Sequence, residues 1–141
     1  MMTRNDTLYG FERYERAKAA FDDARYTDAA RELEDFFTDL AAARAEDTGE
    51  HHDPVGHGTA EMHLLLARAY FHSAQLSRAE SACRAVLVEA PDDSYAHLLL
   101  GRTLQRAGRH DEARGPLRLA ELLGDYTPST DSGAEVADEG F

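Results

Sequence analysis

The chain matches its own sequence when it is shifted by 34 residues. The leucine run Leu64–Leu66 falls on Leu98–Leu100, and the match continues through small, basic and hydrophobic residues. A period between about 20 and 50 residues is typical of repeat proteins, in which each copy is one supersecondary unit that stacks on the next. The further matches are Ala67 with Gly101, Arg68 with Arg102, Tyr70 with Leu104, Ala79 with Ala113, and Arg84 with Arg118.

A third and weaker copy lies upstream at an offset of 50 residues. It pairs Ala17 with Ala67, Lys18 with Arg68, Phe21 with Phe71, Ala24 with Ala74, Thr27 with Ser77, and Ala29 with Ala79. The longer offset implies an insertion between the first two copies. We therefore expect a flexible N-terminus over residues 1–7, a degenerate first repeat over 8–43, a His-rich acidic insertion over 44–59, repeats over 60–93 and 94–124, and an acidic, disordered tail over 125–141.

The second copy is predicted to form two helices. Residues 60–73 are apolar at helical spacing, and the turn 74–76 follows them. Ser77 and Glu80 match a capping box, in which each side chain bonds to a backbone N–H at the start of a helix. Pro91 cannot continue a helix, so we expect the second helix to end there.

The third copy carries its own start and stop signals. Asp92 or Asp93 is expected to cap its first helix. Gly108 is expected in the turn between the two helices, because glycine adopts a left-handed backbone at little cost. Gly115 and Pro116 are expected to interrupt the last helix, since proline removes one helical hydrogen bond.

Small residues recur where the two helices of each copy should cross. In every copy, a small residue in the first helix precedes another in the second helix by 12 positions. Each hairpin leaves one apolar face open, so the hairpins must stack to bury it. The small pairs are Ala17 with Ala29, Ala67 with Ala79, and Gly101 with Ala113; Leu33, Cys83 and Leu117 are expected to fill the space beside them.

These features resemble the tetratricopeptide repeat family over about residues 8–124, most clearly over 60–124. The resemblance implies an all-α fold, a right-handed superhelix of about three helix-turn-helix repeats. It also implies a module that binds peptides or proteins in a concave groove. The residues that carry the resemblance are Leu66, Ala67, Tyr70, Ala79, Val86 and Pro91, followed by Leu100, Gly101, Leu104, Gly108, Ala113, Leu117 and Ala120.

The sequence departs from the family pattern at several core positions. Arg13, His63 and His97 stand where the family favours a large aromatic residue early in each repeat. Arg16 and Ala20 also replace large apolar residues in the first copy. We therefore interpret the first copy as a degenerate N-terminal repeat.

The family's concave groove is lined by the first helix of each pair, so the repeat register predicts which side chains line it. One row has a cation in all three copies, at Lys18, Arg68 and Arg102. Lysine and arginine bind carboxylates, and arginine does so through two hydrogen bonds. The predicted groove residues are Tyr14, Lys18, Phe21, Leu64, Arg68, Phe71, His72, Leu98, Arg102 and Arg106.

Two interpretations of the cationic row stay open. The cations either bind acidic side chains or a free carboxylate of a partner, or they pair with acids of the chain itself as solvated helix charges do.

The formal net charge of −12 disfavours nucleic acid and anionic membranes as partners. The start of the chain does not resemble a signal peptide, and the single cysteine, Cys83, agrees with a reducing compartment, so we expect a cytoplasmic protein. The arginine- and alanine-rich composition suggests a bacterial protein from a GC-rich genome.

The insertion is the alternative place for chemistry. His51, His52 and His57 lie among carboxylates, and histidines with carboxylates can bind zinc or nickel. Their spacing matches no metal motif, and glycines surround them. We therefore expect no resident metal or other cofactor.

The function expected from the sequence is protein–protein interaction, as an adaptor or scaffold, rather than catalysis. No phosphate loop, nucleophile elbow or catalytic triad spacing occurs. The alternatives are metal binding through the insertion and a homo-oligomeric scaffold. In the second alternative, exposed Leu64, Leu65, Leu98 and Leu99 would form an apolar patch for self-association.

Overall fold

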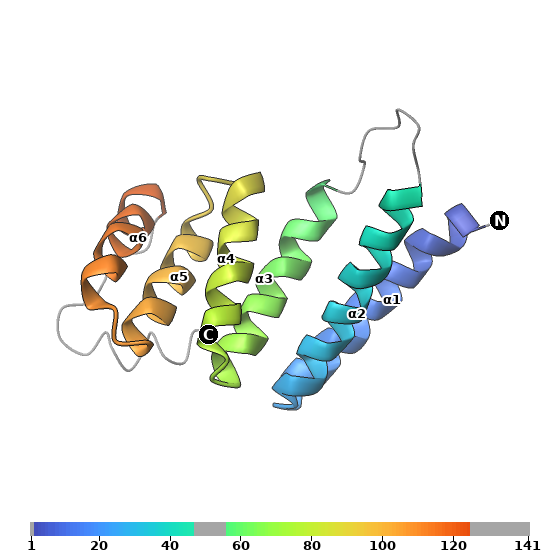
Figure 1. Cartoon of the computed structure of the whole chain (residues 1–141), viewed down its shortest axis with the longest axis horizontal. Coiled ribbons are helices and arrows are strands. Elements are labelled where there is room, and N and C mark those ends of the chain that lie inside the picture. Colours follow the sequence, from blue (N-terminus) through green and yellow to red (C-terminus); the bar gives the residue numbers. More distant parts are fainter. Residues whose placement is uncertain (1, 47–55, 125–141) are drawn as a thin grey trace.

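The described part of the chain is entirely helical. The computed structural model describes residues 2–46 and 56–124, in which there are six helices and no strand (Figure 1). None of these helices is long and apolar enough to cross a bilayer. In chain order they are α1 (Met2–Asp22), α2 (Tyr26–Glu46), α3 (Gly56–His72), α4 (Leu76–Glu89), α5 (Ser94–Arg106) and α6 (His110–Leu123).

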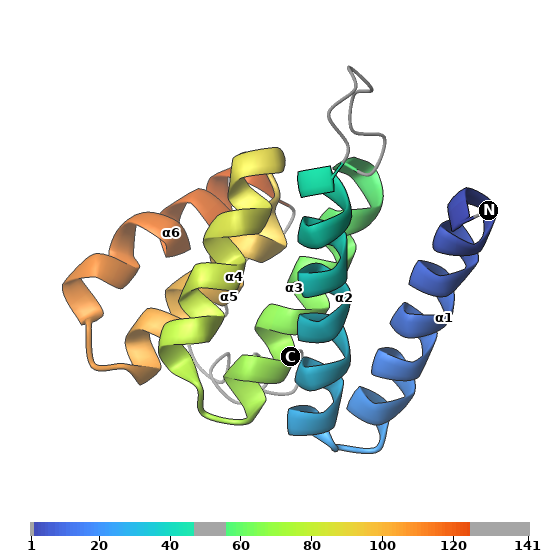
Figure 2. The same ribbon diagram turned by 45° about the vertical axis from the view of Figure 1, so that its right-hand side comes forward.

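The helices follow one another across the molecule as three hairpins. They run from α1 at the right of Figure 1 to α6 at the left, and the turned view in Figure 2 keeps the same order. Each helix packs against the next one in the chain. In addition, α1 contacts α3 and α3 contacts α5, whereas within the described residues the second helices α2, α4 and α6 do not contact one another.

The three hairpin turns have the same geometry. The left-handed residue is Ala24 in the first turn (φ 63°), Ala74 in the second (φ 64°) and Gly108 in the third (φ 82°). In each turn the next backbone N–H bonds at 2.8 Å to a carbonyl five residues earlier, and the left-handed residue bonds three residues back. This pair of bonds defines the Schellman motif, which satisfies carbonyls at a helix end. The three turns occupy equivalent positions of the repeat register, so the two alanines adopt a backbone that normally favours glycine.

Of the predicted helix caps, the one before α5 is present and the one at the start of α4 is not. Asp93 caps α5, because its Oδ1 accepts a hydrogen bond of 3.0 Å from the Ala96 N–H. The predicted capping box of Ser77 and Glu80 is wrong: α4 begins at Leu76, and Gln75 precedes it without a side-chain cap. The Schellman turn fixes where the chain reverses, so Ser77 already lies inside the first turn of the helix.

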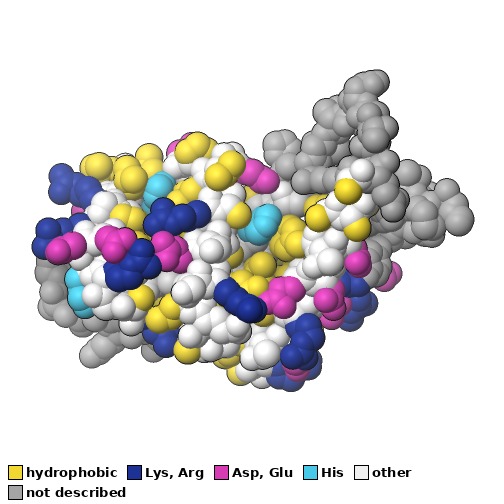
Figure 3. All heavy atoms as spheres, in the orientation of Figure 1, with side chains coloured by type: hydrophobic (Ala, Val, Ile, Leu, Met, Phe, Trp, Pro, Cys, Tyr) yellow, Lys and Arg dark blue, Asp and Glu magenta, His cyan; other side chains and the backbone are white. Residues whose placement is uncertain are grey.

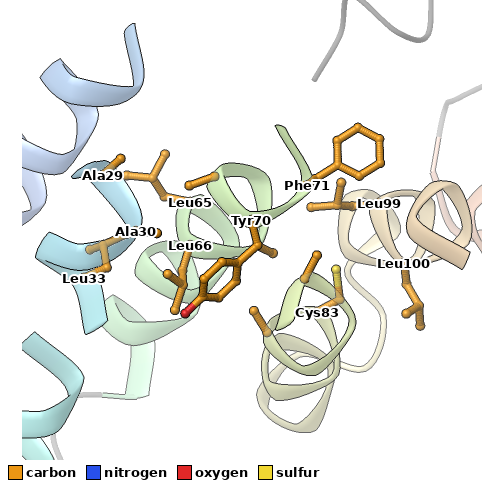
Figure 4. Close-up of a cluster of buried hydrophobic side chains, with 14 of the residues drawn as sticks. Ala29, Ala30, Leu33, Leu65, Leu66, Tyr70, Phe71, Cys83, Leu99 and Leu100 are labelled. Atoms are coloured by element: carbon orange, nitrogen blue, oxygen red, sulfur yellow. The ribbon is translucent and has the colours of Figure 1, made fainter. Parts of the chain in front are cut away.

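The core is built mainly from small side chains and leucines. The six predicted small crossing residues are all buried, as are Leu33 and Cys83. A Cβ on Gly101 would lie 2.5 Å from the Leu117 side chain, so only glycine fits at that crossing. Figure 4 shows side chains of α3, among them Leu65, Leu66 and Tyr70, lying between those of α2 and those of α4 and α5. The middle hairpin therefore joins the other two.

Several expected boundaries differ from the observed helices. Residues 2–7, expected to be flexible, belong to α1, since this stretch has no proline or glycine and extending an existing helix costs little. Both ends of the expected insertion are helical, because α2 extends to Glu46 and α3 starts at Gly56. Helix α6 continues through Pro116 instead of being interrupted, since its flanking turns pack on α5. Residues 47–55 and the tail 125–141 lie outside the described residues.

The polar residues at the usual aromatic position bond to backbone carbonyls. Arg13 donates to the Glu32 carbonyl at 3.3 Å, and His97 Nε2 lies 2.8 Å from the Pro91 carbonyl. His63 Nδ1 lies 3.1 Å from the Thr59 carbonyl, and its ring stacks on Phe37 of α2 at 4.0 Å. This position therefore lies near a backbone carbonyl in all three copies, and His63 adds a stacked ring contact with α2.

Candidate functional site

A hollow of about 250 Å³ lies between α1 and α3. From α1, Tyr14, Lys18, Phe21 and Asp22 reach it with spacings of four, seven and eight residues, which place them on one face of the helix. From α3, the lining residues Glu61, Leu64, Leu65 and Arg68 follow the same helical periodicity. Half of the predicted groove residues thus meet here: Tyr14, Lys18, Phe21, Leu64 and Arg68.

Cations on this side of the molecule lie over aromatic rings. The Lys18 ammonium is 5.5 Å from the centre of the Tyr14 ring, and the Arg68 guanidinium is 4.5 Å from that of Phe21. Such contacts contribute roughly 0.5–1 kcal/mol at exposed sites. Stacking uses the face of a guanidinium and leaves the N–H edges pointing sideways, where they can donate to oxygen.

A third cation–ring contact joins the middle and last hairpins. Arg106 lies 4.6 Å from the centre of the Phe71 ring and donates a hydrogen bond of 2.6 Å to the Phe71 carbonyl. His72 occupies the equivalent position one repeat earlier, and it packs edge-on to Phe21 at 5.5 Å. Tyr26 stacks on His72 at 4.7 Å. Phe71, His72 and Arg106 therefore join neighbouring hairpins, and Phe71, predicted to line the groove, is instead buried in the core at 6% exposure.

We call this surface the first-helix face. It is formed by the side chains of α1, α3 and α5 that point to the same side as the hollow. The repeat register predicts that Leu98 and Arg102 of α5 belong to this face, and Leu98 also packs against the core. Burial raises the pKa of the Tyr95 hydroxyl on α5, and the positive charge of Arg68 on α3 opposes this shift.

Two acidic residues share the hollow with the cations. The Tyr14 hydroxyl donates to Glu61 at 3.3 Å, and burial together with Glu61 raises the pKa of Tyr14. Asp22 lies near the other end of the lining. Sequence analysis missed Glu61 as a site residue, although its spacing of three and seven residues from Leu64 and Arg68 could have placed it on the same face.

The expected apolar patch of four leucines is not present. Leu65 is 5% exposed and Leu99 is fully buried, because the stacking of the hairpins covers them. Leu64 and Leu98 are half-buried and pack against the core. The exposed leucines of the described residues lie instead on the last helix, at Leu119, Leu122 and Leu123.

Cations on the opposite side of the molecule pair with carboxylates. We call this the second-helix face, formed by α2, α4 and the start of α6. Glu80 accepts hydrogen bonds from Arg109 at 2.7 Å and from Arg84 at 2.9 Å, and these bonds, above all that from Arg109, lower the pKa of Glu80. Glu32 of α2 likewise accepts from a cation of the first helix, Arg16 of α1, at 2.8 Å. On the face seen in Figure 3, basic and acidic side chains lie beside one another rather than forming a patch of one sign.

A second, shallower hollow of about 500 Å³ lies between α2 and α4 over α3. The Tyr70 hydroxyl donates to Glu34 at its edge, and Arg78 approaches Glu34 at 3.5 Å. The α4 side of this hollow is formed by small residues, Ser77, Ser81, Ala82 and Ala85. Its one cation is already matched by its one carboxylate.

The candidate metal ligands are not brought together in the described residues. His51 and His52 lie outside the described part of the chain, and His57 is placed only as backbone at the start of α3. Among the described residues there is no group of three or more His, Cys, Asp and Glu that could hold a metal ion. Cys83 is buried, and burial raises the pKa of its thiol to about 12, which makes it a poor nucleophile.

Comparison of the chain with protein-family models, with curated proteins and with solved structures finds no significant match. The candidate site therefore depends on the geometry of the chain itself.

Proposed function

We propose that the chain is a tetratricopeptide-type solenoid in which the first-helix face is the concave surface. Three observations support this proposal: the self-match at 34 residues, the three equivalent Schellman turns, and the small residues buried at each crossing. The first helices contact their equivalents in the next hairpin, whereas the second helices do not. Such spacing is expected of a stack that curves with its first helices on the inside.

We further propose that this face binds an extended segment of another protein, and that the chain acts as an adaptor or scaffold without catalysing a reaction. The observation that carries the proposal is the hollow between α1 and α3, where cations and aromatic rings from two repeats converge. Arg68 and Lys18 suit acidic side chains or a free carboxylate of the partner. Tyr14, Phe21 and Leu64 suit an apolar side chain next to that acid.

The proposed partner class is argued from the net charge, and the proposed location from the single cysteine. The net charge of −12 opposes nucleic acids and anionic membranes, so the proposed partner is a protein or peptide. A buried free thiol at Cys83 agrees with the cytoplasm, where cysteines stay reduced.

The proposal is tested by capturing partners from a lysate of the source organism with the wild-type chain and with a Lys18→Glu/Arg68→Glu/Arg102→Glu variant. A matched control, Arg31→Glu/Arg114→Glu/Arg118→Glu, makes the same change in charge at exposed sites of α2 and α6. We expect a protein that is enriched by the wild type and the control and lost from the first-helix variant. Equal capture by all three chains, each with confirmed helicity, would remove this face as the binding site.

Self-association is the second candidate function. Leu119, Leu122 and Leu123 are 41%, 66% and 44% exposed on α6, and apolar residues on a terminal helix favour contact with a second copy. Light scattering on the wild type and on Leu119→Lys/Leu122→Lys tests this candidate. A dimeric mass that becomes monomeric in the variant supports it, and a monomeric wild type rejects it.

A further inference from the structure

We propose that residues 125–141 bind to the first-helix face of their own chain, across α5 and α3, so that a partner segment must displace them. The inference rests on the proposed function, because it assigns an occupant to the same face. It is argued from the distribution of charge, from where the chain leaves α6, and from the composition of the segment.

The charge on the first-helix face becomes more positive towards the last hairpin. In the hollow between α1 and α3, Lys18 and Arg68 are offset by Asp22 and Glu61. Helix α5, by contrast, contains two arginines and no acid, and it is the only one of the six described helices that lacks an acidic residue. In a chain of net charge −12, α5 is therefore the helix that best suits an anionic segment.

The chain leaves α6 at the start of α5. A Cβ built on Gly124 would lie 2.6 Å from the Ser94 hydroxyl oxygen, so Gly124 lies against the first residue of α5. The 17 residues from 125 to 141 span at most about 56 Å when extended, and α5 with 13 residues is roughly 20 Å long. The segment is thus long enough to follow α5 and reach Arg68 on α3.

The composition of the segment matches the side chains on this face. It contains five acids and no base, with Asp138 and Glu139 followed closely by Phe141. Carboxylates suit Arg68, Arg102 and Arg106, and a phenyl ring suits the aromatic and leucine surface beside them. Because the segment is covalently attached, its local concentration is on the order of millimolar, so individually weak contacts suffice.

The second-helix face is less suited to an acidic segment because of its own acids. There the segment would compete with Glu80, which accepts hydrogen bonds from Arg84 and Arg109, and would meet the acids of α2.

Paramagnetic broadening in the full-length chain tests the proposal. A nitroxide is attached at Ala137→Cys in ¹⁵N-labelled protein; Cys83 is buried, and the unsubstituted chain serves as the control for labelling at that site. We expect loss of amide signal at Arg68, Arg102 and Arg106, with the signals of α2 retained. Adding Asp138→Lys/Glu139→Lys should restore the signals, and this change leaves every described helix intact.

Three results would overturn the inference. They are uniform or absent broadening, broadening that persists in the lysine variant, and broadening that appears when a spin-labelled unenriched chain is mixed with unlabelled ¹⁵N chain. The last result would mean that the segment of a second copy binds instead. The outcome is independent of the capture experiment: a partner lost from the first-helix variant, without broadening, rejects the tail as occupant and keeps the proposed function.

Discussion

The first-helix and second-helix faces use their cations differently. On the second-helix face, arginines bond to glutamates, as around Glu80, where the distances are 2.7 to 3.4 Å. On the first-helix face, Lys18, Arg68 and Arg106 lie over aromatic rings. The paired arginines complete ion pairs within the protein, whereas the cations on the first-helix face are positioned by the rings beneath them.

This difference indicates that the two faces have different roles. Ion pairs on the outside add modestly to stability and contribute little to recognition. Under the proposed function, cations that are already positioned by rings would lose less entropy when a partner segment binds. The following substitutions test this division, in order of decreasing expected effect.

The largest expected loss of stability comes from removing the Phe21 ring, which lies beneath Arg68. Phe21→Ala should lower the free energy of unfolding by about 2 kcal/mol, because Phe21 packs against the core and contacts Tyr26 and His72. Phe11→Ala, the same change on the same helix, should cost less than about 0.5 kcal/mol, since Phe11 is 60% exposed. Urea denaturation followed by circular dichroism measures both. Equal losses would contradict a specific role for the ring on the first-helix face.

The next effect concerns the ion pairs of the second-helix face. Glu80→Gln should lower stability by about 1 kcal/mol near neutral pH, because it removes the charge that Arg109 and Arg84 share. The pKa of Glu80 is lowered in the folded chain, so its contribution is present above the ordinary carboxyl pKa of 4.5 and is lost as the pH falls through the folded value. The difference between wild type and variant should therefore vanish in acid.

Lys18→Met is the matched change on the first-helix face. It should leave the free energy of unfolding within about 0.5 kcal/mol of the wild type. A loss as large as that of Glu80→Gln would mean that the stacked cation is as structural as the paired ones, and the proposed division of roles would be wrong.

A smaller effect is expected at the turns that connect the two faces. Ala24→Gly and Ala74→Gly should each raise stability by about 0.5 kcal/mol, because relief of the left-handed backbone slightly exceeds the added entropy of the unfolded chain. Gly108→Ala should lower it, since φ is 82° there. Thermal melts of the three variants check the shared geometry, with Ala107→Gly, at a residue of negative φ, as the control that should not stabilise.

The smallest effect is a pH dependence at the contact of α3 with α2. Burial lowers the pKa of His63 from its ordinary 6.5, so the unfolded chain takes up the proton more readily. Stability should be complete above pH 6.5 and fall as the pH drops towards the folded value. His63→Phe keeps a ring against Phe37 and should remove this component. The difference between the two stability profiles between pH 5 and 8 isolates it from the other histidines, and a constant difference would reject the assignment.

The repeat pattern predicted the helical hairpins because the residues that recur in it are those that pack within one hairpin or against the next hairpin. The small residues at the crossings and the left-handed turn at Gly108 were predicted correctly, and of the two predicted caps, Asp92 or Asp93, the structure shows Asp93. The turns at Ala24 and Ala74 were not predicted to be left-handed, since alanine carries no such signal. The Ser77 capping box matched a motif that the Schellman turn before it overrides.

The sequence predicted several residues of the candidate site, but it did not predict which side chains contact one another there. Register alone assigned Tyr14, Lys18 and Arg68 to one surface, because equivalent positions of stacked repeats face the same way. Glu61 was missed although its helical spacing from Arg68 matches the same face, whereas the register could not show that Arg106 stacks on the ring of the preceding repeat. It also could not separate buried Leu65 and Leu99 from half-buried Leu64 and Leu98.

The sequence by itself thus determined the helices, their pairing and the order of the hairpins, because these depend on residues within about one repeat of each other. Only the tertiary structure decided which cations pair with carboxylates and which lie over rings. That choice depends on distances between side chains of different hairpins, which are set by the angle and closeness of stacking. Arg84 and Arg68 are the same residue type 16 positions apart, yet the first bonds to Glu80 and the second lies on Phe21.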